Sequence, residues 1–193
     1  MPLQQYSYAN EENIHNVGAI PCGCPESLQK MNIRIATIPD LKSIIEIYNQ
    51  AVDDEFCTAD LEHVTISSME EWFKQHIPDK YPIFIAENKN IVCGWCSLSP
   101  HRPGRKALAS IAEISFYIHK NFRRKGVGKQ LIEYALRKAP QLGFKNLFAL
   151  LMDVNNASIN ILKKYGFIQW GHLPEIADFN GKNCGQLIYG KRL

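Results

Sequence analysis

The sequence of 193 residues has no long apolar run, and none approaches the roughly 20 residues that a membrane-spanning helix needs. A secretory signal is also missing, because such a signal combines a basic start with an apolar core of about 7 to 15 residues. The first thirty residues contain one Lys or Arg, Lys30, and no apolar run longer than residues 17–20. We therefore expect a cytoplasmic protein that does not act at a membrane.

A strong charge imbalance is absent as well. The 22 lysines and arginines exceed the 19 acidic residues by three, which is too little to indicate a nucleic-acid partner. The positive charge is instead local, around residues 120–129 and 137–145. Apolar residues make up 46% of the chain, and a chain of this length buries about 70% of its unfolded surface. One domain can therefore form without disulfides or a metal.

Cysteine is present, but its spacing indicates neither a disulfide framework nor a zinc site. The six cysteines would suit such a framework in a small secreted protein, which we do not expect here. Cys93 and Cys96 have the C-x-x-C spacing, but no second pair follows at the spacing of a zinc ribbon. They lie in an expected strand, where residues three apart point to opposite faces. We expect buried thiols and no metal, and Cys22 and Cys24 make no convincing site either.

The expected elements follow the order β-α-α-β-β-β-α-β-α-β-β. Residues 1–31 are polar and lack periodicity, so we expect an extension outside a domain formed by residues 32–193. Apolar residues at helical spacing predict helices that begin near residues 37, 67, 127 and 155. Alternating or continuous apolar runs predict strands over residues 32–36, 82–87, 91–98, 110–119, 145–152, 167–171 and 185–189. His76 falls on the apolar stripe of the second helix, so we expect it to pack at the edge of the core.

The most informative stretch is residues 123–129, which connect a predicted strand to a predicted helix. Glycines at such a turn allow a ligand to approach the backbone closely, and the first N–H groups of a helix attract phosphate. Four of these seven residues are cations, which suits a diphosphate. A P-loop is excluded because Gln130 follows Lys129, and the dinucleotide fingerprint because Leu131 replaces the third glycine. Alone, the pattern would also fit an ordinary solvated basic turn.

The R-x-x-G-x-G pattern of residues 123–128 resembles the pyrophosphate loop of the GCN5-related N-acetyltransferases (GNAT). An N-x-x-S motif at residues 155–158 and a Gly-Phe pair at 166–167 follow in the order and spacing of that family. The resemblance covers residues 32–193, and residues 112–118 look most like the phosphinothricin and methionine sulfone acetyltransferases. It implies an α/β fold in which about four helices flank a single mixed β-sheet.

In that family the sheet is splayed, and acetyl-CoA would lie in the gap between the strands at 110–119 and 145–152. No metal cofactor is expected. By analogy, the pantetheine arm would pair with the backbone of Phe116, Tyr117 and Ile118. The diphosphate would be held by the loop and the helix start, namely Arg123, Arg124, Lys125, Gly126, Val127, Gly128 and Lys129. Asn155 would bind near the pantetheine or thioester, and Lys164 near the phosphates.

Acetyl transfer from a thioester to an amine needs a base for the ammonium, a donor for the oxyanion and an acid for the thiolate. Glu113 is the expected base, because it shares a strand face with Ser115 and Tyr117 and a partly apolar cleft would raise its pKa. On a solvated sheet face it would have no such role. The family's usual acid, a Tyr or His, corresponds to Leu162, which leaves the acid open between water, Tyr165 and Tyr117.

The acceptor is less well defined than the acetyl donor. Arg105 resembles an arginine of the family's substrate loop and would grip a substrate carboxylate in bidentate fashion, but Leu108 replaces the tyrosine of that loop. The resemblance therefore indicates an acetyl-CoA-dependent N-acetyltransferase for the primary amine of a small molecule, such as an amino acid or its analogue. The alternatives are acetylation of a protein or peptide and a non-catalytic acyl-CoA-binding module. Since members of the family are often dimers, a homodimer is also expected.

Overall fold

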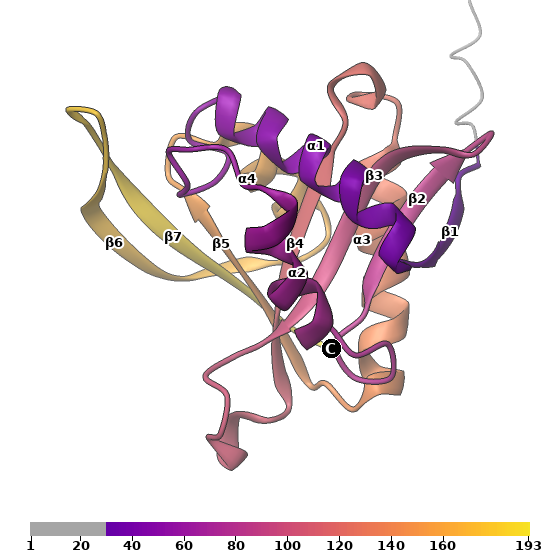
Figure 1. Cartoon of the computed structure of the whole chain (residues 1–193). Coiled ribbons are helices and arrows are strands. Elements are labelled where there is room, and N and C mark those ends of the chain that lie inside the picture. Colours follow the sequence, from indigo (N-terminus) through magenta and orange to yellow (C-terminus); the bar gives the residue numbers. More distant parts are fainter. Residues whose placement is uncertain (1–29) are drawn as a thin grey trace, which may run out of the picture.

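The computed structural model describes residues 30–193 and shows one mixed β-sheet with helices on both faces (Figure 1). Its seven strands run in the order β1-β2-β3-β4-β5-β7-β6. They are β1 (Asn32–Ile35), β2 (Ile83–Asn88), β3 (Ile91–Pro100), β4 (Ile111–Ile118), β5 (Asn146–Met152), β6 (Ile168–Phe179) and β7 (Lys182–Arg192). The α-helices are α1 (Leu41–Asp53), α2 (Ile66–Gln75), α3 (Val127–Lys138) and α4 (Asn156–Lys164). The predicted fold class is confirmed.

Alternation along the central strands sends side chains into two hydrophobic clusters, one on each face of the sheet. One cluster joins Ile83, Ile85 and Trp95 to the buried sides of α1 and α2. The other joins the opposite face of the strands to α3 and α4, which contribute Leu131 and Leu162 among others. Burial of both clusters holds the sheet between two helical layers, and the strands that border the site are fixed by this packing.

The sheet opens in its middle, between the parallel strands β4 and β5. Their pairing ends at Glu113, which stands opposite Phe148. Beyond this point β4 continues to Ile118 alongside β3 only, and β5 continues to Met152 alongside β7 only. The two halves of the sheet therefore form a V whose vertex is the Glu113–Phe148 pair (Figure 1). This confirms the splayed sheet that the family resemblance implied.

The expectation that Cys93 and Cys96 point to opposite faces is wrong, although both thiols are buried as predicted. The register between β2 and β3 shifts between Ala86 and Glu87 of β2. Cys93 of β3 has no partner in β2 at this point. Such a bulge reverses the alternation of the strand. Both cysteines consequently belong to the same cluster, on the α3 face, where they are free thiols. The other C-x-C pair lies outside the described residues.

The C-terminal hairpin is much longer than the strands predicted over residues 167–171 and 185–189. β6 has 12 residues and β7 has 11, and the predicted turn at Asn180 and Gly181 joins them with positive φ at both positions. Pro174 and its polar neighbours hide the strand pattern in the sequence. A shift in register near Pro174 accommodates it, and β6 is the edge strand, where a missing N–H donor is tolerated.

The starts of the first elements differ slightly from the predicted positions. α1 begins at Leu41 because residues 38–40 form a 3-10 turn, and α2 begins one residue after Thr65, whose Oγ1 caps its first turn. Met31 is buried in the core, so the folded unit includes it. The rest of the expected extension, residues 1–29, lies outside the described part of the chain. Among residues 30–193, no helix is both long and apolar enough to cross a membrane.

Candidate active site

The open part of the V holds a groove of about 520 Å³. One wall is the edge of β4, where Phe116, Tyr117 and Ile118 have no strand partner on the β5 side among the described residues. The first turns of α3 and α4 form the opposite wall. A free strand edge offers alternating backbone donors and acceptors to an extended ligand. The groove therefore suits a long molecule that contains amide groups and pairs with β4.

α3 begins in the basic turn that the sequence singles out. Gly126 is its N-cap and has φ +81°, a conformation that residues with a Cβ rarely adopt. The groove is lined here by Arg123, Arg124, Gly126, Val127, Gly128 and Lys129. The first N–H groups of the helix have no partner within it and carry the positive end of its dipole. This end of the groove therefore favours a diphosphate.

The start of α4 faces the same groove. Asn155 is the N-cap of α4, and its Oδ1 accepts a hydrogen bond of 3.1 Å from the N–H of Ser158. Both residues line the groove, together with Ala157. The N-x-x-S spacing thus has a local structural cause, since it caps a helix that points into the groove. Two helix N-termini at one groove add their positive potentials, which strengthens the preference for an anion.

Two of the expected cofactor residues lie away from the groove. Lys125 is exposed, and its Nζ lies 5.6 Å from the centre of the Phe122 ring. Lys164 is exposed at the end of α4 and does not line the groove. Phe122, Ile161 and Cys57 do line it, and the sequence carries no signal for them. They come from three segments that only the folded chain brings together.

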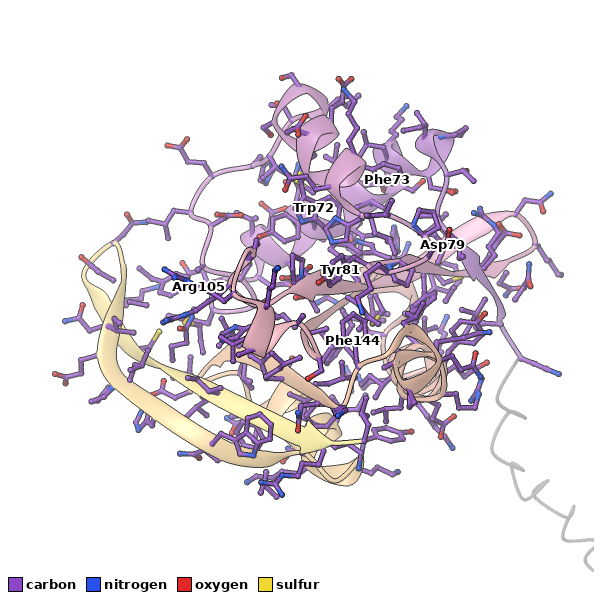
Figure 2. The ribbon with its side chains drawn as sticks, turned by 90° about the horizontal axis from the view of Figure 1, so that it is seen from below. Trp72, Phe73, Asp79, Tyr81, Arg105 and Phe144 are labelled. Carbon is purple, nitrogen blue, oxygen red and sulfur yellow. The ribbon has the colours of Figure 1, made fainter. Side chains whose placement is uncertain are left out.

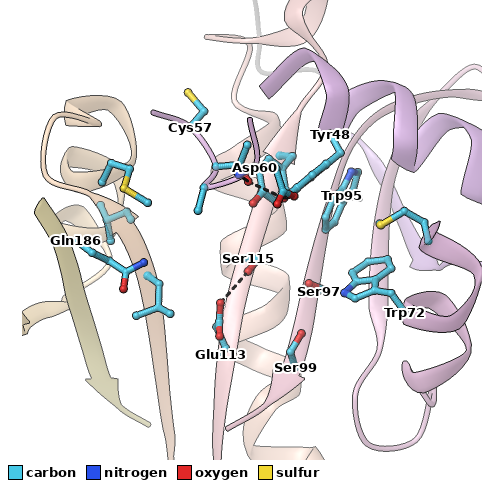
Figure 3. Close-up of a pocket in the computed structure, with 17 residues that line it drawn as sticks. Tyr48, Cys57, Asp60, Trp72, Trp95, Ser97, Ser99, Glu113, Ser115 and Gln186 are labelled. Carbon is cyan, nitrogen blue, oxygen red and sulfur yellow. Dashed lines mark hydrogen bonds between the residues drawn. The ribbon is translucent and has the colours of Figure 1, made fainter. Parts of the chain in front are cut away.

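A second cavity, of about 450 Å³, lies on the α1–α2 side of the sheet (Figure 3). Tyr117 and Cys57 line both the cavity and the groove, so the two spaces adjoin. Four aromatic residues form much of the cavity wall, and their neighbouring ring centres are 4.7 to 6.3 Å apart: Tyr48, Trp72, Trp95 and Tyr117. A cavity with an aromatic wall and a few polar groups is typical of a small-molecule site.

Glu113 faces this cavity from the vertex of the V. It pairs with Ser99 of β3 on one side and with Phe148 of β5 on the other. Its carboxylate shares the cavity side of β4 with Ser115 and Tyr117, as the strand pattern predicts. Burial raises the pKa of Glu113, and a 3.5 Å hydrogen bond from Ser115 Oγ opposes this more weakly. A carboxylate with a raised pKa is a better acceptor for a proton near neutral pH.

A hydroxyl network borders the same cavity. The hydroxyl of Tyr48 lies 2.6 Å from Thr58 Oγ1 and 2.6 Å from Asp60 Oδ2, to which it donates. Burial raises the pKa of Tyr48 to about 12 and also raises that of Tyr117, so both phenols keep their protons. The sequence does not reveal this network. Tyr48 lies on the apolar stripe of a helix, and the loop that carries the other two residues has no motif.

The remaining residues considered for the site lie elsewhere. Leu162 is buried in the core, where it packs with α3 and the sheet. Tyr165 donates a 3.0 Å hydrogen bond to Glu133 and lines neither space, so of the two tyrosines considered as the acid Tyr117 is the one at the site. Arg105 is exposed on the loop that projects between β3 and β4, and it does not line the cavity (Figure 2).

Comparisons with known proteins identify the family. The acetyltransferase (GNAT) family model matches residues 42–167. The Bacillus subtilis protein YwnH, by name a phosphinothricin acetyltransferase, is 38% identical over 164 residues, which are 84% of this chain and 99% of that protein. The L-methionine sulfoximine/L-methionine sulfone acetyltransferase of Pseudomonas paraeruginosa is 29% identical over 78% of this chain and 88% of its own length. A solved structure of the Sinorhizobium meliloti phosphinothricin acetyltransferase in complex with AcCoA has a TM-score of 0.79 at 26% identity, covering 84% of this chain and 88% of that chain.

The chain therefore belongs to the acetyltransferase (GNAT) family. It is therefore an acetyltransferase, as its named relatives are. The family that the basic turn and the N-x-x-S motif resemble is confirmed, and so is the likeness to phosphinothricin and methionine sulfone acetyltransferases.

Proposed function

We propose that this enzyme works in the cytoplasm and transfers an acetyl group from acetyl-CoA to the primary amine of an amino acid or its analogue. Phosphinothricin and methionine sulfone, the compounds in the names of its relatives, are the first acceptors to test. The observation that carries the proposal is the shared wall at Tyr117 between two unlike spaces. One space favours an anion, and the other holds the half-buried carboxylate of Glu113.

The groove fits acetyl-CoA, which supplies an acetyl group activated as a thioester. The edge of β4 from Phe116 to Ile118 would hold the pantetheine arm, and Asn155 would lie near the thioester. The first turn of α3 would hold the diphosphate together with Arg123, Arg124 and Lys129. Lys125 and Lys164 lie outside the groove, so we propose that they add only long-range positive charge.

Glu113 is the proposed general base. An ammonium group has no lone pair with which to attack, so it must first lose a proton. The ionised carboxylate attracts the ammonium into the cavity and then takes one of its protons. Because burial raises the pKa of Glu113, the proton transfer is less unfavourable than it would be to a solvated carboxylate. The neutral amine is left in the cavity, which adjoins the groove at Tyr117 and Cys57.

Tyr117 is the proposed acid for the departing thiolate. Its side chain lies on the same face of β4 as Glu113, and it lines both spaces. Burial raises the pKa of the phenol and keeps it protonated, so its O–H can donate a hydrogen bond that stabilises a sulfur anion formed in the groove. This assigns to one residue the role that Leu162 cannot fill, since Leu162 has no proton to donate and is buried in the core.

The cavity favours a small acceptor over a protein or peptide, because aromatic side chains enclose a space of about 450 Å³. A non-catalytic module would not need a half-buried carboxylate and a protonated tyrosine on the same strand face. Arg105 lies outside the cavity, so its proposed hold on a substrate carboxylate would need the loop to fold over the cavity.

We also propose that the protein is a homodimer with no nucleic-acid or membrane partner. Light scattering can test the oligomeric state, and binding assays can test the absence of these partners.

Calorimetric titration with acetyl-CoA is the first experiment, with desulfo-CoA and ATP as controls. Micromolar binding, worth about 8 kcal/mol, and no response to ATP are expected. Thiol release is then measured with a panel of amines that includes phosphinothricin, L-methionine sulfone and phenylethylamine. Absence of binding at millimolar acetyl-CoA would overturn the role of the groove. Binding without turnover of any amine would favour the non-catalytic module.

A further inference from the structure

Ser99 and His76 form a hydrogen-bonded pair at the wall of the cavity. Nε2 of His76 lies 3.0 Å from Ser99 Oγ, and Nδ1 lies 2.7 Å from the main-chain oxygen of Trp72. A carbonyl oxygen can only accept, so Nδ1 carries a hydrogen. Burial lowers the pKa of His76 and favours the neutral ring. Nε2 is then an acceptor, and the hydroxyl of Ser99 donates to it.

This direction leaves the lone pairs of Ser99 Oγ available to the cavity, which Ser99 lines. Ser99 stands directly opposite Glu113 in the register of β3 and β4, and such opposite Cβ atoms lie about 4.5 to 5.5 Å apart. Ser115 flanks the same carboxylate, and its hydroxyl donates to the ionised Glu113 across 3.5 Å. Figure 3 shows Glu113 and Ser115 on β4 and Ser99 on the neighbouring strand. Three oxygen acceptors therefore face one corner of the cavity.

The rest of the cavity wall also suits a cation. Asp60 adds a second carboxylate, and the aromatic rings offer their negative faces. Among the 17 described residues that line the cavity, none is Lys, Arg or His. An ammonium group that leaves water needs a hydrogen-bond acceptor for each of its N–H groups. A primary ammonium has three such groups, and the corner beside Glu113 offers three acceptors.

We propose that Ser99, oriented by His76, accepts a hydrogen bond from the ammonium group of the acceptor and makes the enzyme selective for primary amines. His76 is a positioning residue, because it acts through Ser99. A secondary ammonium has two N–H groups, so it leaves one acceptor unpaired and places a methyl group against it. The inference rests on the proposed function, since it needs the acceptor amine to occupy this cavity.

Steady-state kinetics of the full chain test the role of Ser99, with the best acceptor of the amine panel and its N-methyl derivative as probes. In Ser99→Ala, KM for the primary amine rises about tenfold, the size expected for one hydrogen bond to a charged group. The preference for the primary over the N-methyl amine falls by a similar factor. Ser99→Thr keeps the hydroxyl and retains more of the preference for the primary amine than Ser99→Ala does. The Kd for acetyl-CoA, measured by calorimetry, is unchanged in both variants.

A double-mutant cycle tests the role of His76. His76→Leu raises KM for the amine, and His76→Gln, which retains an acceptor, restores part of the loss. The variant that combines Ser99→Ala with His76→Leu is no worse than Ser99→Ala alone, because His76 has no route to the amine except through Ser99. A packing role of His76 would instead give additive effects, and thermal unfolding of each variant reports such a loss of packing.

The outcomes separate this inference from the proposed function. Wild-type protein that acetylates no amine overturns both. Wild-type turnover together with an unchanged KM and amine preference in Ser99→Ala overturns the inference and leaves the proposed function standing. Additive effects in the double variant would show that His76 is structural and contradict its positioning role.

Discussion

The groove and the cavity adjoin at Tyr117, but they are built in different ways. Most residues of the groove come from two continuous segments, the end of β4 with the start of α3 and the start of α4, and Cys57 is added from the loop after α1. The cavity consists of residues from α1, α2, the loop after α1 and four strands, β3, β4, β5 and β7. Its key residues include Tyr48, Trp72, Ser99 and Glu113, which are far apart in the sequence. Residues that are neighbours in the sequence can form a recognisable motif, whereas residues that are far apart cannot.

The two spaces also differ in charge. The groove has Arg123, Arg124 and Lys129 along its wall together with two helix N-termini. The cavity has Glu113 and Asp60, with no cationic side chain among its described lining residues. Opposite potentials in adjoining spaces allow an anionic donor and a cationic acceptor to bind side by side without competing for one site. The predictions below test whether the two spaces are functionally separate.

The largest effect should come from Glu113→Gln, which changes the cavity and leaves the groove intact. We expect kcat to fall by about 10² to 10⁴, the usual contribution of a positioned general base. The Kd for acetyl-CoA should stay within about twofold, since losing a groove interaction would cost more than this. Thiol-release assays and calorimetry on the same sample measure the two quantities. Unchanged turnover would remove Glu113 as the base.

Gly126→Val should weaken the binding of acetyl-CoA in the groove and leave the residues of the cavity in place. Gly126 has φ +81°, and a β-branched residue there costs about 1–3 kcal/mol and displaces the first turn of α3. We expect the Kd for acetyl-CoA to rise roughly tenfold or more. Gly104→Val is the matched control, because Gly104 has φ +83° but lies in the loop before β4, with nothing near its added Cβ. Equal losses of affinity in both variants would mean that the effect is general strain.

The pH dependence of kcat should reflect the ionisation of Glu113 in the cavity and not the state of the groove. Since burial raises the pKa of Glu113, its active carboxylate form is lost at a higher pH than for a solvated glutamate. As pH falls below this raised pKa, kcat should decrease by up to about tenfold per pH unit. The matching acid limb should be absent from the residual activity of Glu113→Gln. If kcat still decreases at low pH in Glu113→Gln, the decrease must come from the titration of another group.

The smallest effects distinguish two lysines that the family resemblance treats alike. Lys129 lines the groove, whereas Lys164 does not. Lys129→Ala should raise the Kd for acetyl-CoA by about three- to tenfold, as expected for one partly exposed charge contact. Lys164→Ala should change it by less than about twofold. Calorimetry at low and at high salt measures both, and the Lys129 effect should shrink as salt screens it. A larger effect of Lys164→Ala would place the phosphates beyond the groove.

Much of the fold and of the groove could be predicted because their causes are local. Gly126 and Gly128 mark a turn, Asn155 and Ser158 mark a helix cap, and alternation along β4 places Glu113 on one face. These features depend on residues within one or two turns of each other, so they survive in the sequence as motifs. The long β6 could not be predicted, because a register shift absorbs Pro174 and only pairing with β7 supports it.

The sequence by itself determined the family, the basic turn before α3 and the strand face that carries the proposed base. Only the tertiary structure decided that a bulge turns Cys93 to the face of Cys96 and that His76 reaches Ser99. It also decided which aromatic residues line the cavity that Glu113 faces. The physical reason is that register and helix packing are set by the whole core. A side chain on one element can therefore acquire its function from partners that are distant in the chain.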